Sequence, residues 1–206
     1  MKNWLQSLAA LALTLLVGQA GAQTPSAPAP AGQRATAIFA GGCFWCVEAD
    51  FEKLPGVIAA ESGYTGGKTA NPTYQTVSAG GTGHTEAVRL TYDPGVVSYP
   101  VLLDFFWRHI DPTVKDRQFC DVGDQYRSAI YYNSPAQKAL VEASKAALLK
   151  SGVLKEIHTE IAPESAFYLA EDYHQSYYKK NPLRYNYYRL TCGRDSRVAE
   201  VWGTKN

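Results

Sequence analysis

The chain has 206 residues and a formal net charge of +1, so its composition indicates neither a nucleic-acid-binding protein nor one held on an anionic membrane. Its aromatic content, with 14 Tyr, 7 Phe and 4 Trp, fits a core that also lines an apolar pocket, although a Tyr-rich core alone gives the same composition.

Residues 1–22 predict a secretory signal peptide. They contain a lysine near the start, a short apolar run and the small residues AGA at the end. The apolar run is too short to span a bilayer, and no later segment is long and apolar enough to do so. We therefore expect cleavage near Ala22, export to the periplasm and no membrane contact afterwards. A retained N-terminal anchor is the alternative.

Two further segments follow the expected cleavage site. Residues 23–34 are rich in Pro and Ala and have no apolar period, which is typical of a linker. Residues 35–206 are enough for one domain with a well-buried core.

Hydrophobic periodicity and turn residues predict an alternation of strands and helices through this domain. In chain order we expect a strand at 35–42, a helix at 43–54, strands at 57–64 and 84–92, a helix at 98–110, a strand at 126–132, a helix at 134–152, a strand at 156–162 and a short helix at 170–181. The pattern predicts an α+β fold, specifically a two-layer α/β plait with a ferredoxin-like core and a long, mostly irregular C-terminal tail, in which DSRVAEVW (195–202) is expected to add a turn of helix.

The four cysteines are Cys43, Cys46, Cys120 and Cys192. In an exported chain they suggest structural disulfides with three possible pairings, but a domain of this size does not need them. A zinc site would show a second closely spaced pair of Cys or His, whereas Cys120 and Cys192 are far apart in the sequence. The cysteine pattern therefore gives little support for a metal site.

The stretch GGCFWCVEA (41–49) places Cys43 at the start of the predicted helix. Backbone N–H groups and the helix dipole favour an anion in a first turn, so we expect a lowered pKa for Cys43. Undistorted helical neighbours at the spacing of Cys43 and Cys46 hold their Cβ atoms about 5–6 Å apart, whereas a disulfide needs about 3.5–4.5 Å. A bond between them requires a loosened first turn, which suits a bond that forms and breaks during turnover. The bulky Phe44 and Trp45 between the cysteines favour a small apolar substrate group.

Seven segments resemble, in the right order, the A-type peptide methionine sulfoxide reductases. They are GGCFWCVE (41–48), SGYTGG (62–67), NPTY (71–74), GHTEAV (83–88), QYRSAIYY (125–132), AEDYHQ (170–175) and KNPLRY (180–185). The resemblance implies reduction of methionine S-sulfoxide, in proteins and as the free amino acid. It also implies electrons from a thioredoxin-like disulfide reductant and no metal or organic cofactor. We expect the protein to be a monomer.

The resemblance implies roles for residues in the first matching segment. Cys43 matches the nucleophile that attacks the sulfoxide sulfur, and Phe44 and Trp45 match the residues that hold the S-methyl group. The product on Cys43 is then a sulfenic acid, which a second thiol condenses to a disulfide.

The same resemblance implies a polar set around the sulfoxide oxygen. Glu86 matches the acid that gives the oxygen a proton, Tyr74 and Tyr126 match phenols that hydrogen-bond it, and Asp121 matches a further pocket acid. A proton donor lowers the barrier to loss of the oxygen, and burial keeps a Glu protonated at neutral pH. Two phenolic donors aimed at the oxygen act as an oxyanion hole does.

The sequence departs from the family pattern in ways that affect the resolving cysteine. Cys46 stands where many members have glycine, Thr85 replaces the more usual alanine, and the tail around Cys192 contains little glycine. Cys46, Cys192 and Cys120 are therefore all candidates to attack the sulfenic acid. Proximity favours Cys46, with Cys192 as a second relay to the surface.

Two other functions fit part of the pattern. A periplasmic thiol–disulfide oxidoreductase accounts for Cys43 and Cys46 but gives Phe44, Trp45 and Glu86 no role. A non-catalytic binding module stapled by disulfides accounts only for the number of cysteines.

Overall fold

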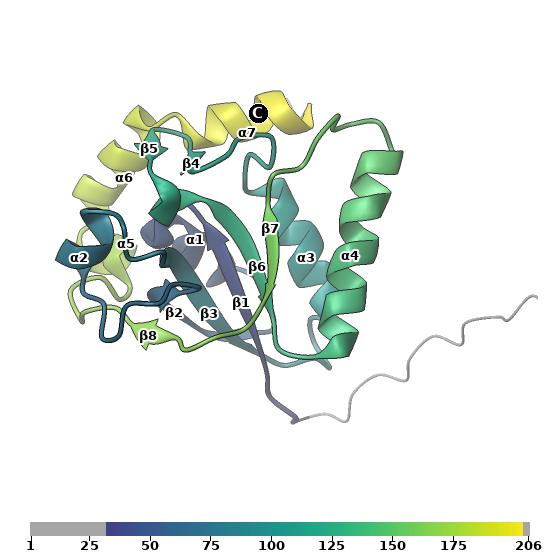
Figure 1. The fold of residues 1–206 in the computed structure, drawn as a ribbon, viewed down its shortest axis with the longest axis horizontal. Helices are drawn as coiled ribbons and strands as arrows, with labels where there is room; N and C mark the ends of the chain where they lie inside the picture. The colour runs from purple at the N-terminus through teal and green to yellow at the C-terminus, as the bar shows by residue number, and fades with distance from the viewer. Residues whose placement is uncertain (1–31, 204–206) are drawn as a thin grey trace, which may run out of the picture.

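The computed structural model describes residues 32–203, which form a mixed α/β fold around one six-stranded sheet (Figure 1). The predicted signal peptide and nearly all of the predicted linker lie outside the described residues. Within 32–203, no helix combines the length and apolar character needed to cross a bilayer.

The six strands lie in the order β7-β6-β1-β3-β2-β8. Their bounds are β1 Ala35–Gly41, β2 Val57–Thr65, β3 Thr85–Tyr92, β6 Ser128–Tyr132, β7 Glu160–Pro163 and β8 Tyr168–Leu169. Every neighbouring pair is antiparallel except β6 and β7, which are parallel. A separate two-stranded hairpin is formed by β4 (Arg117–Gln118) and β5 (Asp121–Val122).

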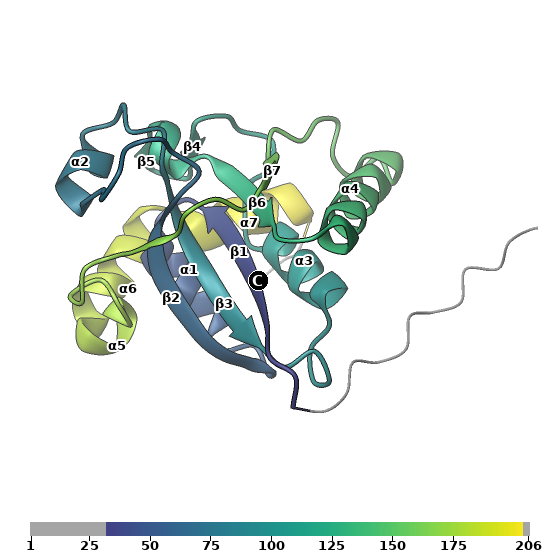
Figure 2. The ribbon, with the colours of Figure 1, turned by 60° about the horizontal axis from the view of Figure 1, so that its bottom comes forward.

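Helices cover one face of the sheet and both of its sides. They are α1 Phe44–Phe51, α2 Tyr74–Ser78, α3 Tyr99–Arg108, η1 Asp124–Tyr126 (one turn of 3-10 helix), α4 Pro135–Lys150, α5 Tyr177–Lys180, α6 Pro182–Thr191 and α7 Arg194–Trp202. Figure 2 shows α4 at one side of the molecule and α5 with α6 at the other. The N-terminal end of α1 lies close to α2, β5 and η1, since residues from all four line one cavity.

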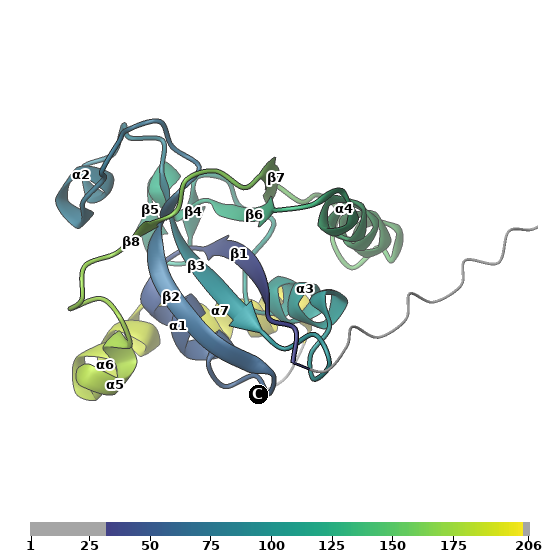
Figure 3. The same cartoon turned by 90° about the horizontal axis from the view of Figure 1, so that it is seen from below.

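The main core lies between the sheet and helices α1 and α3. Phe39 of β1 is fully buried there, with its ring stacked 5.2 Å from that of Phe51 in α1 and 4.9 Å from that of Phe106 in α3. Its neighbour Ile38 points to the opposite face, where it packs in a second, smaller cluster. Figure 3 shows the segment between β7 and β8 crossing that opposite face, and Phe167 from this segment packs on the smaller cluster. Burial of β1 on both faces explains its almost continuous apolar sequence.

The predictions from periodicity are confirmed best where end signals are strong. Helix α4 was expected at 134–152 and spans Pro135–Lys150. Ser134 caps it by accepting a hydrogen bond from the backbone N–H of Gln137 at 3.2 Å, and Gly152 follows with a φ of +75°.

The predicted irregular tail is wrong, because α6 and α7 occupy most of the last 25 residues. The helix predicted at 170–181 is confined to Tyr177–Lys180, and the strand predicted at 156–162 begins only at Glu160. Periodicity and turn residues did not predict α2, η1, β8 or the β4–β5 hairpin, whose elements are each five residues long or shorter.

Candidate active site

All seven residues predicted to catalyse or bind substrate line one cavity. The cavity has a volume of about 60 Å³, and its walls are Cys43, Phe44, Trp45, Tyr74, Glu86, Asp121, Tyr126 and Tyr188. These residues come from α1, α2, β3, β5, η1 and α6, so the cavity forms only when distant parts of the chain meet. The structure brings the side chains together, and the role of each remains a prediction.

A pair of glycines, Gly41 and Gly42, precedes Cys43, which lines the cavity. Gly42 has a φ of +84°, and a Cβ at this position would lie 2.5 Å from the Cβ of Gln118. The turn makes Cys43 the N-cap of α1, whose carbonyl accepts hydrogen bonds from the N–H groups of Cys46 and Val47. Cys43 therefore precedes the helix rather than lying in its first turn, and its backbone is free of the helical constraint that we expected to oppose a bond to Cys46.

The pKa expected for Cys43 is wrong in direction. Burial raises the pKa of the Cys43 thiol well above its usual value, and Cys46, Glu86 and Asp121 raise it further. The hydrogen bond from Cys43 lowers the pKa of Cys46, helped by Arg194 and Arg189. Position at a helix N-terminus does not dominate here, because the backbone N–H of Phe44 donates to Glu86 Oε2 at 3.0 Å instead of to the sulfur.

Glu86 is a buried carboxyl group beside the nucleophile candidate. It lies on β3, is 2% exposed, and its Oε2 accepts the Phe44 hydrogen bond. Burial raises its pKa to about 8, and the charge of Asp121 adds to the effect. Glu86 is therefore protonated at neutral pH and is able to donate a proton, as predicted from the residue type and its expected surroundings.

The two predicted phenols also line the cavity. Tyr74 begins α2, where its backbone N–H donates to Glu171 Oε1 at 2.9 Å, and Tyr126 ends η1. Burial raises the pKa of both phenols, with Glu86 as a further cause in each case. Both hydroxyl groups thus keep their protons and can donate hydrogen bonds into the cavity.

The aromatic wall depends on His174, to which the sequence analysis assigned no role. The Trp45 Nε1–H donates to His174 Nδ1 at 2.9 Å, and the Trp45 ring stacks on that of Tyr177 with centroids 3.7 Å apart. Burial lowers the pKa of His174, so its ring is neutral and accepts this hydrogen bond. His174 lies in AEDYHQ, a segment that resembles the family, and this resemblance could have identified it as a residue of the site.

Tyr188 is a cavity residue that the sequence analysis missed. Its hydroxyl donates to Asp121 Oδ2 at 2.5 Å, and its pKa is raised by burial, with Cys43 and Asp121 as further causes. Tyr188 is one of two tyrosines in NYYRLTC, a stretch predicted to be irregular. The signal was the spacing of four residues from Tyr188 to Cys192, which puts both on one side of a helix.

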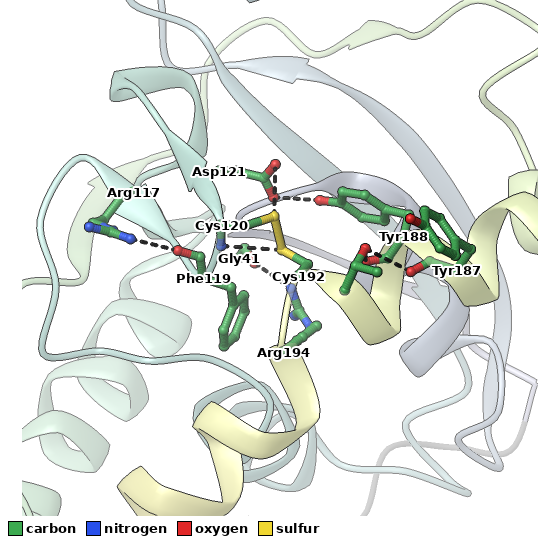
Figure 4. The surroundings of a disulfide bond; sticks show 10 residues. Gly41, Arg117, Phe119, Cys120, Asp121, Tyr187, Tyr188, Cys192 and Arg194 are labelled. Carbon is green, nitrogen blue, oxygen red and sulfur yellow. Dashed lines mark hydrogen bonds between the residues drawn. A yellow bond between two sulfur atoms is a disulfide. The ribbon is translucent and has the colours of Figure 1, made fainter.

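The two remaining cysteines are bonded to each other. Cys120 and Cys192 form a disulfide at the surface beside Asp121, whereas Cys43 and Cys46 are free and buried (Figure 4). Cys120, Asp121 and Cys192 also form one cluster of metal-ligand spacing within residues 32–203, with ligand atoms within 4.8 Å of one another. Because both sulfurs are in the disulfide, neither is available as a thiolate ligand.

Comparisons with known proteins agree on one family. The family model for peptide methionine sulfoxide reductase matches residues 35–206. A relative from Caulobacter vibrioides, peptide methionine sulfoxide reductase MsrA 2, is 50% identical over 186 residues, covering 89% of this chain and 92% of the relative. MsrA of Bacillus subtilis is 51% identical over 170 residues, covering 82% and 96%. The solved structure of reduced Mxr1 from Saccharomyces cerevisiae superposes with a TM-score of 0.69 at 34% identity, covering 73% of this chain and 87% of Mxr1.

Proposed function

Because this chain belongs to the peptide methionine sulfoxide reductase family, we propose that Cys43 is its nucleophile. The enzyme reduces methionine S-sulfoxide, in proteins and as the free amino acid, through a cysteine sulfenic acid and an intramolecular disulfide, and so repairs oxidised protein. The observation that carries the assignment to Cys43 is that it lines the same cavity as Glu86, Tyr74 and Tyr126.

In the first step, the Cys43 sulfur attacks the sulfoxide sulfur and takes over its oxygen. Cys43 starts as a thiol and ends as a sulfenic acid, and the sulfoxide becomes a thioether, so the number of protons is unchanged. Glu86 donates its proton to the oxygen as the bond to the substrate sulfur breaks, and the Cys43 proton restores the acid. The hydroxyl groups of Tyr74 and Tyr126 stabilise the oxygen by hydrogen bonds.

The S-methyl group of the substrate binds against Phe44 and Trp45. Both rings line the cavity, and the contacts of Trp45 with His174 and Tyr177 fix its orientation. A rigid aromatic wall accepts a methyl group and offers no hydrogen bond to the oxygen, so it selects the orientation in which the oxygen meets Glu86.

In the second step, we propose that Cys46 attacks the sulfenic acid of Cys43, which releases water and forms the Cys43–Cys46 disulfide. Cys46 is free, and it is hydrogen-bonded to Cys43. Cys120 and Cys192 are bonded to each other, which does not support either of them as the first resolving thiol. The relay role predicted for Cys192 stays a prediction.

One equivalent of S-epimer methionine sulfoxide tests both steps when the chain starts with Cys43 and Cys46 reduced and no reductant is added. We expect about one methionine per chain, loss of two thiols, and a Cys43–Cys46 disulfide in the peptide map. Cys43→Ser should release no methionine, whereas Cys46→Ser should release it but retain a sulfenic acid. Release of methionine by Cys43→Ser would refute the assignment of the nucleophile.

We propose that a thioredoxin-like protein returns the enzyme to its reduced state by exchange of its dithiol with the internal disulfide. Mxr1, the yeast relative, has been solved in complex with Trx2, which supports a partner of this kind. Nothing in the site or the comparisons supports the alternative function of a general thiol–disulfide oxidoreductase, and the two free, buried cysteines do not fit a binding module stapled throughout by disulfides.

Three further proposals concern the whole chain. The strand order β6-β1-β3-β2, with α1 after β1 and α3 after β3, supports a ferredoxin-like plait as the core. The pattern of residues 1–22 supports export to the periplasm with cleavage near Ala22, which N-terminal sequencing of the protein from that compartment checks. A monomer is the expected oligomeric state, and light scattering in solution tests it.

A further inference from the structure

We propose that the Cys120–Cys192 disulfide is a positioning element of the active site, which fixes the hydrogen bond between Asp121 and Tyr188 beside Cys43. The inference rests on the proposed role of Cys43 as nucleophile. It assigns a function to two cysteines that the two steps above do not use, since Cys43 and Cys46 complete them.

The disulfide and the Asp121–Tyr188 hydrogen bond connect the same two segments. Cys120 directly precedes Asp121, and Cys192 lies one helical turn after Tyr188, to whose carbonyl its N–H donates at 2.9 Å. The Cys120 N–H donates to Cys192 Sγ at 3.2 Å, and the Tyr188 hydroxyl donates to Asp121 Oδ2 at 2.5 Å (Figure 4). The covalent bond therefore keeps the two ends of the hydrogen bond within reach of each other.

The segment that carries Asp121 is held at its start by the buried Gln118, which accepts from the Asp111 N–H at 3.0 Å and donates to the Asp111 carbonyl at 2.7 Å, whereas the pairing of its strands adds little. Strands β4 and β5 have two residues each and pair with no other described strand. Phe119, between them, has a φ of +54°, a conformation that a bulky residue keeps only when its surroundings impose it. One of these surroundings is the Arg194 guanidinium, 4.5 Å from the centre of the Phe119 ring. Among the contacts that hold this hairpin, the disulfide is the covalent one.

The hydrogen bond matters because both partners face the nucleophile. Asp121 and Tyr188 line the cavity with Cys43, and Cys43 contributes to the raised pKa of the Tyr188 phenol. If the bond between Cys120 and Cys192 opens, α6 and the hairpin are joined only by non-covalent contacts, so Asp121 and Tyr188 lose a fixed position. A displacement of such groups by about 1 Å is enough to slow a reaction by roughly 10².

The disulfide can be opened without entry into the cavity. Cys120 is exposed and Cys192 is half-buried, whereas Cys43 is only 7% exposed. A dithiol that attacks the surface bond is oxidised to its own disulfide, and Cys120 and Cys192 each gain a proton. The oxidation state of the surface disulfide thus controls the rate of the reaction in the buried active site.

The test uses the full chain with Cys46→Ser as a common background, because Cys43 is then the single free thiol while the surface disulfide is intact. Three forms are compared: the intact form, the same protein after treatment with dithiothreitol and removal of the reagent, and the Cys120→Ser/Cys192→Ser variant. Thiol titration verifies one, three and one free thiols. The rate of methionine release from S-epimer methionine sulfoxide in the first turnover is then measured in each form.

We expect the first turnover to slow by about tenfold when the disulfide is opened or replaced. Tyr188→Phe should slow the intact form by about tenfold but change the Cys120→Ser/Cys192→Ser form by less than about twofold, since the two changes remove the same interaction. The midpoint of Cys43 alkylation should also move to lower pH in the opened forms, because the Asp121 charge that raises the Cys43 pKa is no longer held there. A disulfide that only stabilised the fold would leave this midpoint unchanged in folded protein.

Equal first-turnover rates in the intact and opened forms would overturn the proposal, as would additive effects of Tyr188→Phe and loss of the disulfide. Equal rates combined with loss of thioredoxin-supported turnover in Cys120→Ser/Cys192→Ser on an otherwise unsubstituted chain would show an electron relay instead. If the double variant does not fold, the dithiothreitol-treated form supplies the same comparison. Failure of the intact form to release methionine would contradict the proposed function of Cys43, and is thereby distinguished from failure of the inference.

Discussion

Glu86 is a proton donor at neutral pH because the fold buries its carboxyl group. An ordinary glutamic acid is ionised at pH 7, but removal from water raises the pKa of this side chain to about 8. The hydrogen bond from the Phe44 N–H acts in the opposite direction and is weaker than the effect of burial. Glu86 therefore keeps a proton for catalysis, and its burial lowers the free energy of unfolding. Both effects can be measured.

The first prediction concerns activity. Because the proton of Glu86 is needed, the rate of the sulfoxide step should fall as the pH rises through about 8. Glu86→Gln should lower kcat/KM by about 10²- to 10³-fold at pH 7 and abolish this descending limb. Rapid-quench measurement of methionine release from pH 6 to 10 checks both. A descending limb that persists in Glu86→Gln would assign it to another group.

The second prediction concerns stability. Below pH 4.5 the carboxyl is protonated in both the folded and unfolded chain, but between that pH and about 8 only the unfolded chain loses the proton. The free energy of unfolding therefore falls as the pH rises through this window, by up to about 1.4 kcal/mol per pH unit. Glu86→Gln should be more stable than the wild type by about 2–4 kcal/mol at pH 8.5, with the difference much reduced near pH 4.5. Urea unfolding at the two pH values tests this, and an equal difference at both would contradict it.

At the residue scale, the sequence predicted which side chains meet but not every charge state. Six of the seven cavity residues lie in segments that resemble the family, and Asp121 lies just before the segment QYRSAIYY. The pKa of Cys43 could not be predicted, since it depends on the full burial of the sulfur and on Asp121, which arrives from 78 residues further along the chain. Tyr188 was missed because one tyrosine among several carries no distinguishing pattern until the helix that holds it is known.

At the scale of elements, Glu48 connects α1 to the sheet and to the loop before α5. Its Oε2 accepts from the Ser62 hydroxyl at 2.6 Å, and its Oε1 accepts from the Ser176 N–H at 2.6 Å. The next residue back, Gln175, bonds both the N–H and the carbonyl of Ser62. This network fixes the loop from which His174 reaches Trp45, so a residue outside the cavity sets the aromatic wall.

The third prediction therefore concerns Glu48→Ala. It leaves the Ser62 hydroxyl and the Ser176 N–H without their partner, which should cost about 2–4 kcal/mol of the free energy of unfolding. The loop should also loosen, so KM for methionine sulfoxide should rise several-fold as Trp45 loses its orientation. Denaturant unfolding and steady-state kinetics measure the two effects. Glu142→Ala, at an exposed position of α4 where the carboxylate pairs with Lys138, is the control and should change both quantities little.

Helix α6 could not be predicted from periodicity because its apolar residues face water. Leu183, Tyr187 and Leu190 are 87%, 72% and 79% exposed, and they share one side of the helix. The buried residue of α6 is Tyr185, while Arg189 contacts Asp50 in α1. Polar and aromatic contacts hold this helix in place, whereas the periodicity rule assumes that an apolar stripe does so. By contrast, the bounds of α4 were predicted closely, because Ser134 and Pro135 mark the start of the helix and Gly152 marks its end through local backbone preferences.

For the molecule as a whole, the surface disulfide joins positions 72 residues apart. The closed loop contains β5, η1, β6, β7, β8 and helices α4 to α6, and thus about two fifths of the described residues. By the chain-entropy argument, a loop of this size destabilises the unfolded chain by about 4 kcal/mol.

The fourth prediction follows. The Cys120→Ser/Cys192→Ser variant should have a free energy of unfolding about 2–4 kcal/mol lower than that of the disulfide-bonded chain, with an unchanged fold by circular dichroism. Urea unfolding without reductant measures the difference. Addition of dithiothreitol should lower the stability of the wild type towards that of the variant and leave the variant itself unaffected. Equal stability of the two proteins without reductant would contradict the prediction.

The same closed loop changes what a single peptide-bond cut does to the molecule. The segment around Gly152, after α4, is exposed and lies inside the loop, so a protease that cuts there yields two fragments that stay joined through sulfur. One fragment carries Cys43, Glu86 and Tyr126, and the other carries Tyr188. A nicked molecule would therefore migrate as one species on a non-reducing gel and as two after reduction, while keeping every wall of its cavity.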